Sequence, residues 1–293
     1  MKKEFGCQSM TAPLRRVIVK TPESAFENEE QIARQWQDLG YTGRPDLQRA
    51  ANEHRLFVSI LQKHGAEIFY LDQDHRAGLD SIYAHDAGLI TDQGAIIFQT
   101  GKATRRGEGP ALMDALQRWN VSILGAVDGN ATAEGGDMVW LDQKTLLVGV
   151  GFRTNAAGVE QLRAMLRKFD IRVMPFDLPY WNGPADVLHL MSFLSLLDDD
   201  LAVIYPRLMP VPLYQMLKER RIQLVTIPEE EFDTQACNVL ALAPRTVLML
   251  KGNPITKAKL MEAGCRVEEY EGDEISMKGS GGPTCLTRPL LRA

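Results

Sequence analysis

The chain has 293 residues, of which 45% are hydrophobic and 24% are charged, as in soluble globular proteins. With 33 basic and 38 acidic residues the net charge is −5, which argues against nucleic acid or an anionic membrane as the main partner. Apolar runs stay well short of the roughly 20 residues that span a bilayer, and the N-terminal segment lacks the apolar core of a secretory signal. The 4 cysteines form no C-x-x-C pair, which argues against a disulfide scaffold or structural zinc. We therefore expect a cytoplasmic protein.

One unit recurs along the chain at intervals of about 50 residues: a helix, a strand, and then a hairpin of two apolar runs around a polar turn. The predicted helices span 47–64, 110–119, 158–169, 212–220 and 255–263. The strands that follow them span 67–71, 121–125, 171–175, 222–225 and 265–270. Hairpins are expected over 87–98, 138–148, 189–205 and 239–250. A fifth begins at Gly281 and is completed by an N-terminal strand over 16–20.

Five such units indicate an α/β propeller, in which each blade is one repeat and the two chain ends close the ring. A doubly wound parallel sheet also alternates helix and strand, but it needs one strand per helix, whereas here each helix is followed by about three. No glycine-rich phosphate loop leads into a helix either, because residues 279–282 (GSGG) precede a predicted strand. We expect a single domain over residues 1–293.

Polar residues occur at the start of each predicted hairpin. In a radial array of repeats, these starts lie close to the central axis. They are Asp80 and Asp86, then Glu134, His189, Asn238 and Cys285. Each has an ordinary structural explanation: a buried inert thiol, a core histidine, or turn and cap residues. Their common phase in the repeat favours one shared site instead.

The motifs at these positions resemble those of the guanidine-modifying enzymes, which include arginine deiminases, amidinotransferases and dimethylarginine dimethylaminohydrolases. The resemblance rests on residues 134–137 (EGGD), His189-Leu190 and residues 281–287 (GGPTCLT). Residues 80–86 (DSIYAHD), followed by 105–108 (RRGE), look most like the dimethylargininase branch. It covers the chain from about Arg16 to Leu290, and its implied fold, the five-bladed α/β propeller or pentein, agrees with the repeats.

The resemblance implies a guanidinium substrate and a covalent mechanism without metal or organic cofactor. Glu134 and Asp86 would hold the planar cation through charge-assisted hydrogen bonds. Cys285 would add to the guanidinium carbon as a thiolate. His189 would protonate the leaving amine and later deprotonate the water that hydrolyses the thiouronium. The net reaction is cleavage of a C–N bond that leaves a ureido product such as citrulline.

The remaining site residues would bind the rest of the substrate. Arg105 and Arg153 resemble family positions that bind the α-carboxylate, although each can equally be a loop charge, with Glu108 as the partner of Arg105. Asp80 would bind the α-amine of the substrate or position other site residues without touching the substrate. Asn238 is expected to be a further substrate-binding residue.

Three positions depart from the branches of this superfamily. Met191 stands where deiminases and amidinotransferases have an acid, a loss that dimethylargininases share. His85 replaces an acid expected beside Asp86, and Thr284 replaces a histidine of the deiminases. Amidino transfer and arginine deimination therefore stay open as alternatives, and a non-catalytic binding protein is the rival class. The oligomeric state also stays open, with a homodimer allowed.

Overall fold

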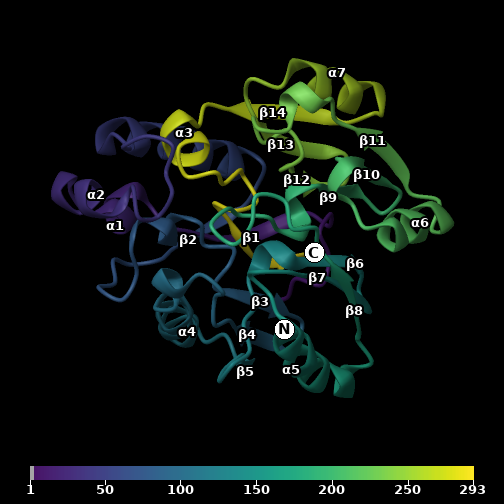
Figure 1. Ribbon diagram of the computed structural model, residues 1–293, viewed down its shortest axis with the longest axis horizontal. Coiled ribbons are helices and arrows are strands. Elements are labelled where there is room, and N and C mark those ends of the chain that lie inside the picture. The colour runs from purple at the N-terminus through teal and green to yellow at the C-terminus, as the bar shows by residue number, and fades with distance from the viewer. Residues whose placement is uncertain (1–2) are drawn as a thin grey trace.

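The computed structural model describes residues 3–293 as five three-stranded sheets arranged in a ring (Figure 1). In each sheet the middle strand pairs antiparallel with one neighbour and parallel with the other. The sheets contain β15 (Arg288–Arg292), β1 (Leu14–Val19) and β2 (Glu67–Tyr70); β3 (Gly88–Thr91), β4 (Gly94–Ile97) and β5 (Ile123–Ala126); β6 (Met138–Asp142), β7 (Thr145–Val150) and β8 (Arg172–Asp177); β9 (Leu194–Asp198), β10 (Leu201–Ile204) and β11 (Gln223–Thr226); β12 (Leu240–Ala243), β13 (Thr246–Leu250) and β14 (Arg266–Tyr270). The predicted five-bladed α/β propeller is confirmed.

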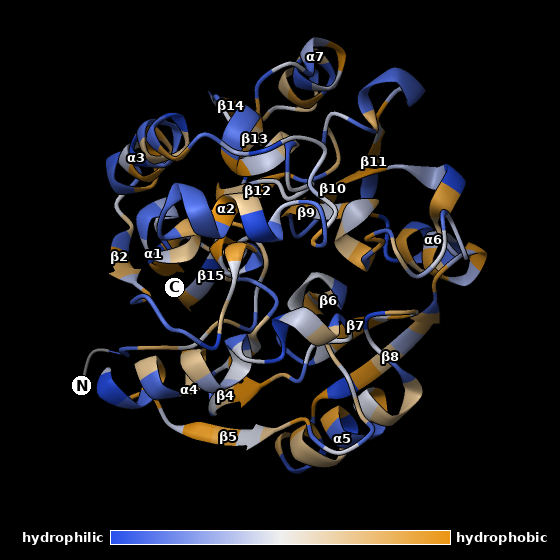
Figure 2. Ribbon diagram, turned by 60° about the vertical axis from the view of Figure 1, so that its left-hand side comes forward, coloured by the Kyte–Doolittle hydropathy of each residue, from blue (hydrophilic) through white to orange (hydrophobic). Residues whose placement is uncertain are grey.

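A helix joins the second and third strands of every blade and lies at the outer rim of the ring (Figures 1 and 2). These helices are α3 (Leu47–Lys63), α4 (Glu108–Arg118), α5 (Ala156–Leu166), α6 (Val211–Glu219) and α7 (Pro254–Glu262). The first blade adds two short helices, α1 (Pro22–Phe26) and α2 (Glu29–Gln35), which the repeat does not include. No helix within residues 3–293 is both long and apolar enough to cross a membrane.

Local sequence explains where the longest helix begins and ends. The Asp46 carboxylate accepts a hydrogen bond of 2.8 Å from the backbone N–H of Arg49 and so caps the N-terminus of α3. Phe57 and Leu61 are fully buried and pack this helix into the blade. The helix ends before Gly65, whose φ of 87° is a left-handed conformation that glycine adopts without strain.

The two ends of the chain close the ring, as the repeat predicted. β1 pairs antiparallel with the C-terminal β15 and parallel with β2. The last strand begins at Arg288, however, and not at Gly281. Between Gly281 and Arg288 the chain forms a turn, in which the Leu286 N–H donates a hydrogen bond of 3.2 Å to the Gly282 carbonyl. Such a turn uses backbone groups that a strand would give to its neighbour, and it carries Cys285 at the start of the blade.

Candidate active site

The starts of the five hairpins meet around one cavity of about 410 Å³ near the axis of the ring. Short turns precede three of them, at Leu79–Ile82, Gly135–Asp137 and Leu190–Ser192. Seven of the eight predicted site residues line this cavity: Asp80, Asp86, Arg105, Arg153, His189, Asn238 and Cys285. The eighth, Glu134, is fully buried directly behind His189. The structure therefore brings all eight residues together.

Cys285 is partly exposed, whereas the other three cysteines are buried. The Asn238 side-chain amide donates a hydrogen bond of 3.2 Å to its sulfur. Asn238 is itself fixed by the Thr284 hydroxyl, which donates to the amide oxygen at 2.7 Å. Burial, and then the negative charge of Asp86, raise the pKa of the Cys285 thiol, so the unliganded site favours the thiol form.

His189 lies against Glu134, with its Nε2 atom 2.8 Å from Oε2 of that carboxylate. Burial disfavours the charged imidazolium, but the carboxylates of Asp137, Asp86 and Glu134 outweigh it and raise the pKa of His189 to about 9. A side chain at Gly136 would lie 2.3 Å from the His189 ring, so the ring position requires glycine there. The site thus presents a protonated imidazole at neutral pH.

Asp86 is held by a buried arginine. Its Oδ2 atom lies 2.7 Å from an Arg105 nitrogen, and Oδ1 accepts the Gly136 N–H at 2.9 Å. Burial opposes ionisation of Asp86, but the positive charges of Arg105 and His189 hold its pKa well below the usual range. Asp86 is therefore a preorganised carboxylate at the cavity wall, as a bound cation requires.

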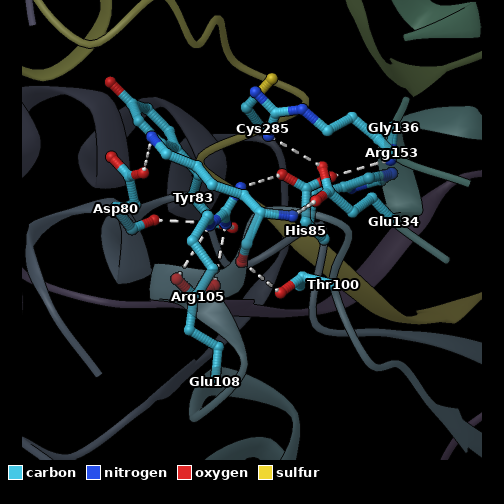
Figure 3. Close-up of polar contacts among 12 residues, drawn as sticks. Asp80, Tyr83, His85, Thr100, Arg105, Glu108, Glu134, Gly136, Arg153 and Cys285 are labelled. Atoms are coloured by element: carbon cyan, nitrogen blue, oxygen red, sulfur yellow. Dashed lines mark hydrogen bonds and ion pairs between the residues drawn. The ribbon is translucent and has the colours of Figure 1, made fainter. Parts of the chain in front are cut away.

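Arg105 itself is not a solvated loop charge, since only 4% of it is exposed. Its guanidinium bonds both oxygens of Glu108, at 2.9 and 2.8 Å, as well as Asp86 and two backbone carbonyls (Figure 3). The pairing with Glu108 considered from the sequence is present, but it is buried. Few Arg105 donors remain free for an α-carboxylate, a role that stays a prediction.

Arg153 has looser contacts. One terminal nitrogen lies 3.4 Å from Oε2 of Glu134, and the other lies 3.5 Å from the Asp186 carbonyl. Because these bonds are long, its guanidinium retains donors that can face the cavity. Of the two arginines, Arg153 is the better placed to bind a carboxylate.

Sequence reasoning missed Lys102, which ties three parts of the site together. Its ammonium lies 2.6 Å from Asp80 and 2.7 Å from the Leu39 carbonyl, while its backbone N–H donates to Glu134 at 3.1 Å. A single lysine in a loop carries no pattern that distinguishes it from a solvated charge. The Lys102 ammonium thereby already pairs with the Asp80 carboxylate.

The positions that depart from the superfamily are also buried. Met191 lines the cavity without a charge. His85 does not act as the acid expected at this position. Its Nδ1 atom lies 2.7 Å from the Thr287 carbonyl. Since a carbonyl only accepts, Nδ1 carries the proton and Nε2 is free to accept from Arg288 at 3.3 Å.

Asp86, Glu134 and His189 also offer ligand atoms within 4.8 Å of one another, a spacing that suits a metal ion. These atoms are already engaged with the Arg105 guanidinium and the His189 imidazolium. A metal ion would have to displace both contacts, whereas a guanidinium can add to the cavity side of Asp86.

Comparison with known proteins identifies relatives over nearly the whole chain. The family model for N,N dimethylarginine dimethylhydrolase, eukaryotic, matches residues 21–292. The N(G),N(G)-dimethylarginine dimethylaminohydrolase of Pseudomonas aeruginosa is 29% identical over 247 residues, 84% of this chain and 91% of that protein. An uncharacterised protein of Bacillus subtilis, YkgA, is 26% identical over 287 residues, 98% of this chain and 95% of its own.

Solved structures show the same relationship. A mutant of the Pseudomonas aeruginosa enzyme complexed with citrulline has a TM-score of 0.76 at 26% identity, covering 96% of this chain and 100% of that one. The amidinotransferase SxtG of Microseira wollei has a TM-score of 0.80 at 16% identity, covering 99% and 97%, which shows the shared fold. This chain therefore belongs to the dimethylarginine dimethylhydrolase family of the guanidine-modifying enzymes.

Proposed function

We propose that this protein hydrolyses a methylated arginine to citrulline and the methylated amine, with arginine itself as a poorer substrate. It is an amidine-hydrolysing enzyme by family, and the observation that carries the substrate class is the composition of the cavity wall. A thiol, a protonated imidazole and an ionised carboxylate meet there, and Met191 lines the same cavity without a charge.

Substrate binding would activate the nucleophile. The guanidinium binds against Asp86, and its positive charge offsets the carboxylate that raises the pKa of the Cys285 thiol. The thiol then loses its proton to solvent and the thiolate attacks the guanidinium carbon. This forms a C–S bond and a tetrahedral intermediate whose three nitrogens remain attached.

The protonated His189 would complete the first half of the reaction. It donates its proton to the substituted nitrogen, the C–N bond breaks, and the neutral amine leaves. A thiouronium on Cys285 remains, and His189 is now a neutral base. Glu134 and Asp137 stabilise the charged form of His189, so they set how readily this proton is released.

Water would complete the second half. His189 takes one proton as the water oxygen attacks the thiouronium carbon. The C–S bond then breaks, the remaining hydroxyl proton is lost to solvent, and the neutral ureido group is released. The thiolate regenerated at Cys285 is protonated from solvent when the product leaves. One imidazole therefore serves both half-reactions.

The amino-acid end of the substrate would be bound by the cations and acids at the cavity mouth. Arg153 is our candidate for binding the α-carboxylate, because its N–H donors form fewer and longer hydrogen bonds within the protein than those of Arg105. Asp80 is our candidate for the α-amine, which would compete with Lys102 for the same carboxylate. Arg105 then acts chiefly by orienting Asp86.

Two alternative reactions use the same first half. In a deiminase the leaving group is ammonia, and in an amidinotransferase an amine replaces water. Met191 disfavours both, because a carboxylate at that position would give unsubstituted N–H groups a second acceptor.

The deciding experiment is product analysis of the pure protein with arginine, monomethylarginine, dimethylarginine and agmatine, with and without an acceptor amine. We expect citrulline and methylamine or dimethylamine as the main products. Ammonia from arginine alone, or an amidino product that requires the acceptor, would replace the proposal by one of the two alternatives.

Three finer points belong to the same proposal. We place the enzyme in the cytoplasm, treat residues 1–293 as a single catalytic domain, and take a homodimer as the state to test by light scattering. The net charge of −5 supports a small-molecule substrate rather than nucleic acid.

A further inference from the structure

A second cavity lies on the axis of the ring, behind the active site. His85, Met191 and Thr284 line both cavities and so separate them. The segment around Ser9 and Met10 covers the other side of the second cavity. Its space is small, about 10 Å³, which favours a single small occupant.

Two buried arginines from β15 line this second cavity without a carboxylate partner. Arg288 donates to the backbone carbonyls of His85 and Gly88, at 3.1 and 2.7 Å. Arg292 donates to the carbonyls of Ala12 and Ala241, at 2.6 and 2.8 Å. Within residues 3–293, neither guanidinium forms an ion pair, and no acidic residue lines the cavity.

The two arginines nevertheless carry charge at neutral pH. Burial lowers the pKa of Arg288 to about 10, and burial also lowers that of Arg292. The facing histidine adds no charge of its own, because burial and then Arg288 lower the pKa of His85 to about 3 and leave it neutral. Cys7 is a thiol here, since burial raises its pKa although both arginines oppose this.

Asp86, the acid that acts on Arg288 from the other side, is already bound to Arg105. Two positive charges therefore face a space with no counter-charge, which is costly in a protein interior.

The unsatisfied polar atoms at this cavity are donors. The Nε–H of Arg288 and the indole N–H of Trp140 are both buried without a hydrogen-bond partner among the described residues. Trp140 lies on β6, across the axis from β15 (Figure 2). Both groups can only donate, so they would be satisfied by an occupant of this space that accepts hydrogen bonds.

We propose that this axial cavity binds a single monatomic anion of the chloride class, held by Arg288, Arg292 and the indole N–H of Trp140. The small space favours a monatomic ion over the larger sulfate, phosphate and carboxylate groups. An anion supplies the missing counter-charge and accepts both orphan hydrogen bonds, whereas a water molecule supplies no charge. The site is distinct from the substrate cavity, and it links β15 to β6 across the axis of the ring.

The test uses the full-length protein in sodium gluconate, whose anion is too large for the cavity. Chloride or bromide replaces gluconate at constant ionic strength, and the thermal midpoint and the ³⁵Cl NMR linewidth are followed. We expect a saturable rise in the midpoint and saturable line broadening. Crystals grown with bromide should show an anomalous peak within hydrogen-bond distance of Arg288 and Trp140.

The decisive variant is Trp140→Phe, which removes one donor and keeps an aromatic ring. We expect its halide dissociation constant to rise about tenfold or more, as for loss of a hydrogen bond to a charged acceptor. Trp119→Phe is the matched control and should leave halide binding unchanged, because Trp119 packs against Phe69 and neither residue lines the axial cavity. Equal stability in gluconate and chloride, identical halide binding by the two variants, or a water in place of the bromide peak would each overturn the proposal.

Discussion

Nε2 of His189 and Oε2 of Glu134 lie 2.8 Å apart although the two residues are 55 positions apart in the chain. The contact joins the entrances of two neighbouring blades, and it forms because Gly136 lets the imidazole ring approach the backbone. The contact has a measurable consequence for stability, because it helps His189 to keep a proton at pH values where the histidine of the unfolded chain has lost it.

Folded His189 keeps its proton up to about pH 9, whereas an unfolded histidine loses it near about pH 6.5. Its contribution to stability is therefore fully present below the lower value and is lost as the pH rises through the higher one, with a size of up to about 3 kcal/mol. We expect the free energy of unfolding, measured by urea titration, to fall between these pH values. The fall should be smaller in Glu134→Gln, and an unchanged pH dependence in that variant would contradict the raised pKa.

Replacing Cys285 by serine should reduce turnover at least about a thousandfold, because a serine hydroxyl is not ionised by these neighbours at neutral pH. Stability should change little, since Cys285 is partly exposed. Cys265→Ser is the control and should keep near wild-type activity. A Cys285→Ser enzyme with a tenth of the wild-type rate would remove Cys285 as nucleophile.

His189→Asn should slow both half-reactions, since one imidazole protonates the leaving amine and activates the water. Where the second half becomes the slower one, mass spectrometry of a quenched reaction should show the thiouronium mass on the peptide that contains Cys285. Circular dichroism provides the check on folding. Unaltered steady-state rates in the folded variant would exclude His189 from the mechanism.

Arg153→Lys should raise the KM for methylated arginine about tenfold or more, because it loses charge-assisted bonds to the α-carboxylate. The KM for a methylated agmatine, which lacks that carboxylate, should barely change. Arg163→Lys, a surface substitution on α5, serves as the control. Equal effects on both substrates would mean that Arg153 acts elsewhere, for example by orienting Glu134.

Met191→Asp should move the preference towards unmethylated arginine, since a buried carboxylate requires N–H donors that methyl groups remove. In the wild-type enzyme we expect kcat/KM for methylated arginine to equal or exceed that for arginine. Met191→Leu keeps the wall uncharged and should retain this preference. The same ratio of kcat/KM values in wild type and Met191→Asp would show that position 191 does not select the substrate.

The sequence by itself determined the repeat, the closure of the ring by its two ends, and the set of polar residues around the axis. These features follow from local patterns: helical and strand periodicity, capping residues such as Asp46, and motifs at a constant phase. The repeat alone places the start of the last strand too early, at Gly281, because turn bonds such as that from the Leu286 N–H to the Gly282 carbonyl fold residues 281–287 back before β15 begins.

Only the tertiary structure decided which charges meet. Lys102 reaches Asp80, Arg105 is shared between Asp86 and Glu108, and Glu134 lies behind His189 rather than on the cavity wall. The convergence of Arg288 and Trp140 at the axis is likewise invisible in the chain. Each pairing depends on the angle between separate blades, and the free energy of a buried charge depends on which partner that angle supplies.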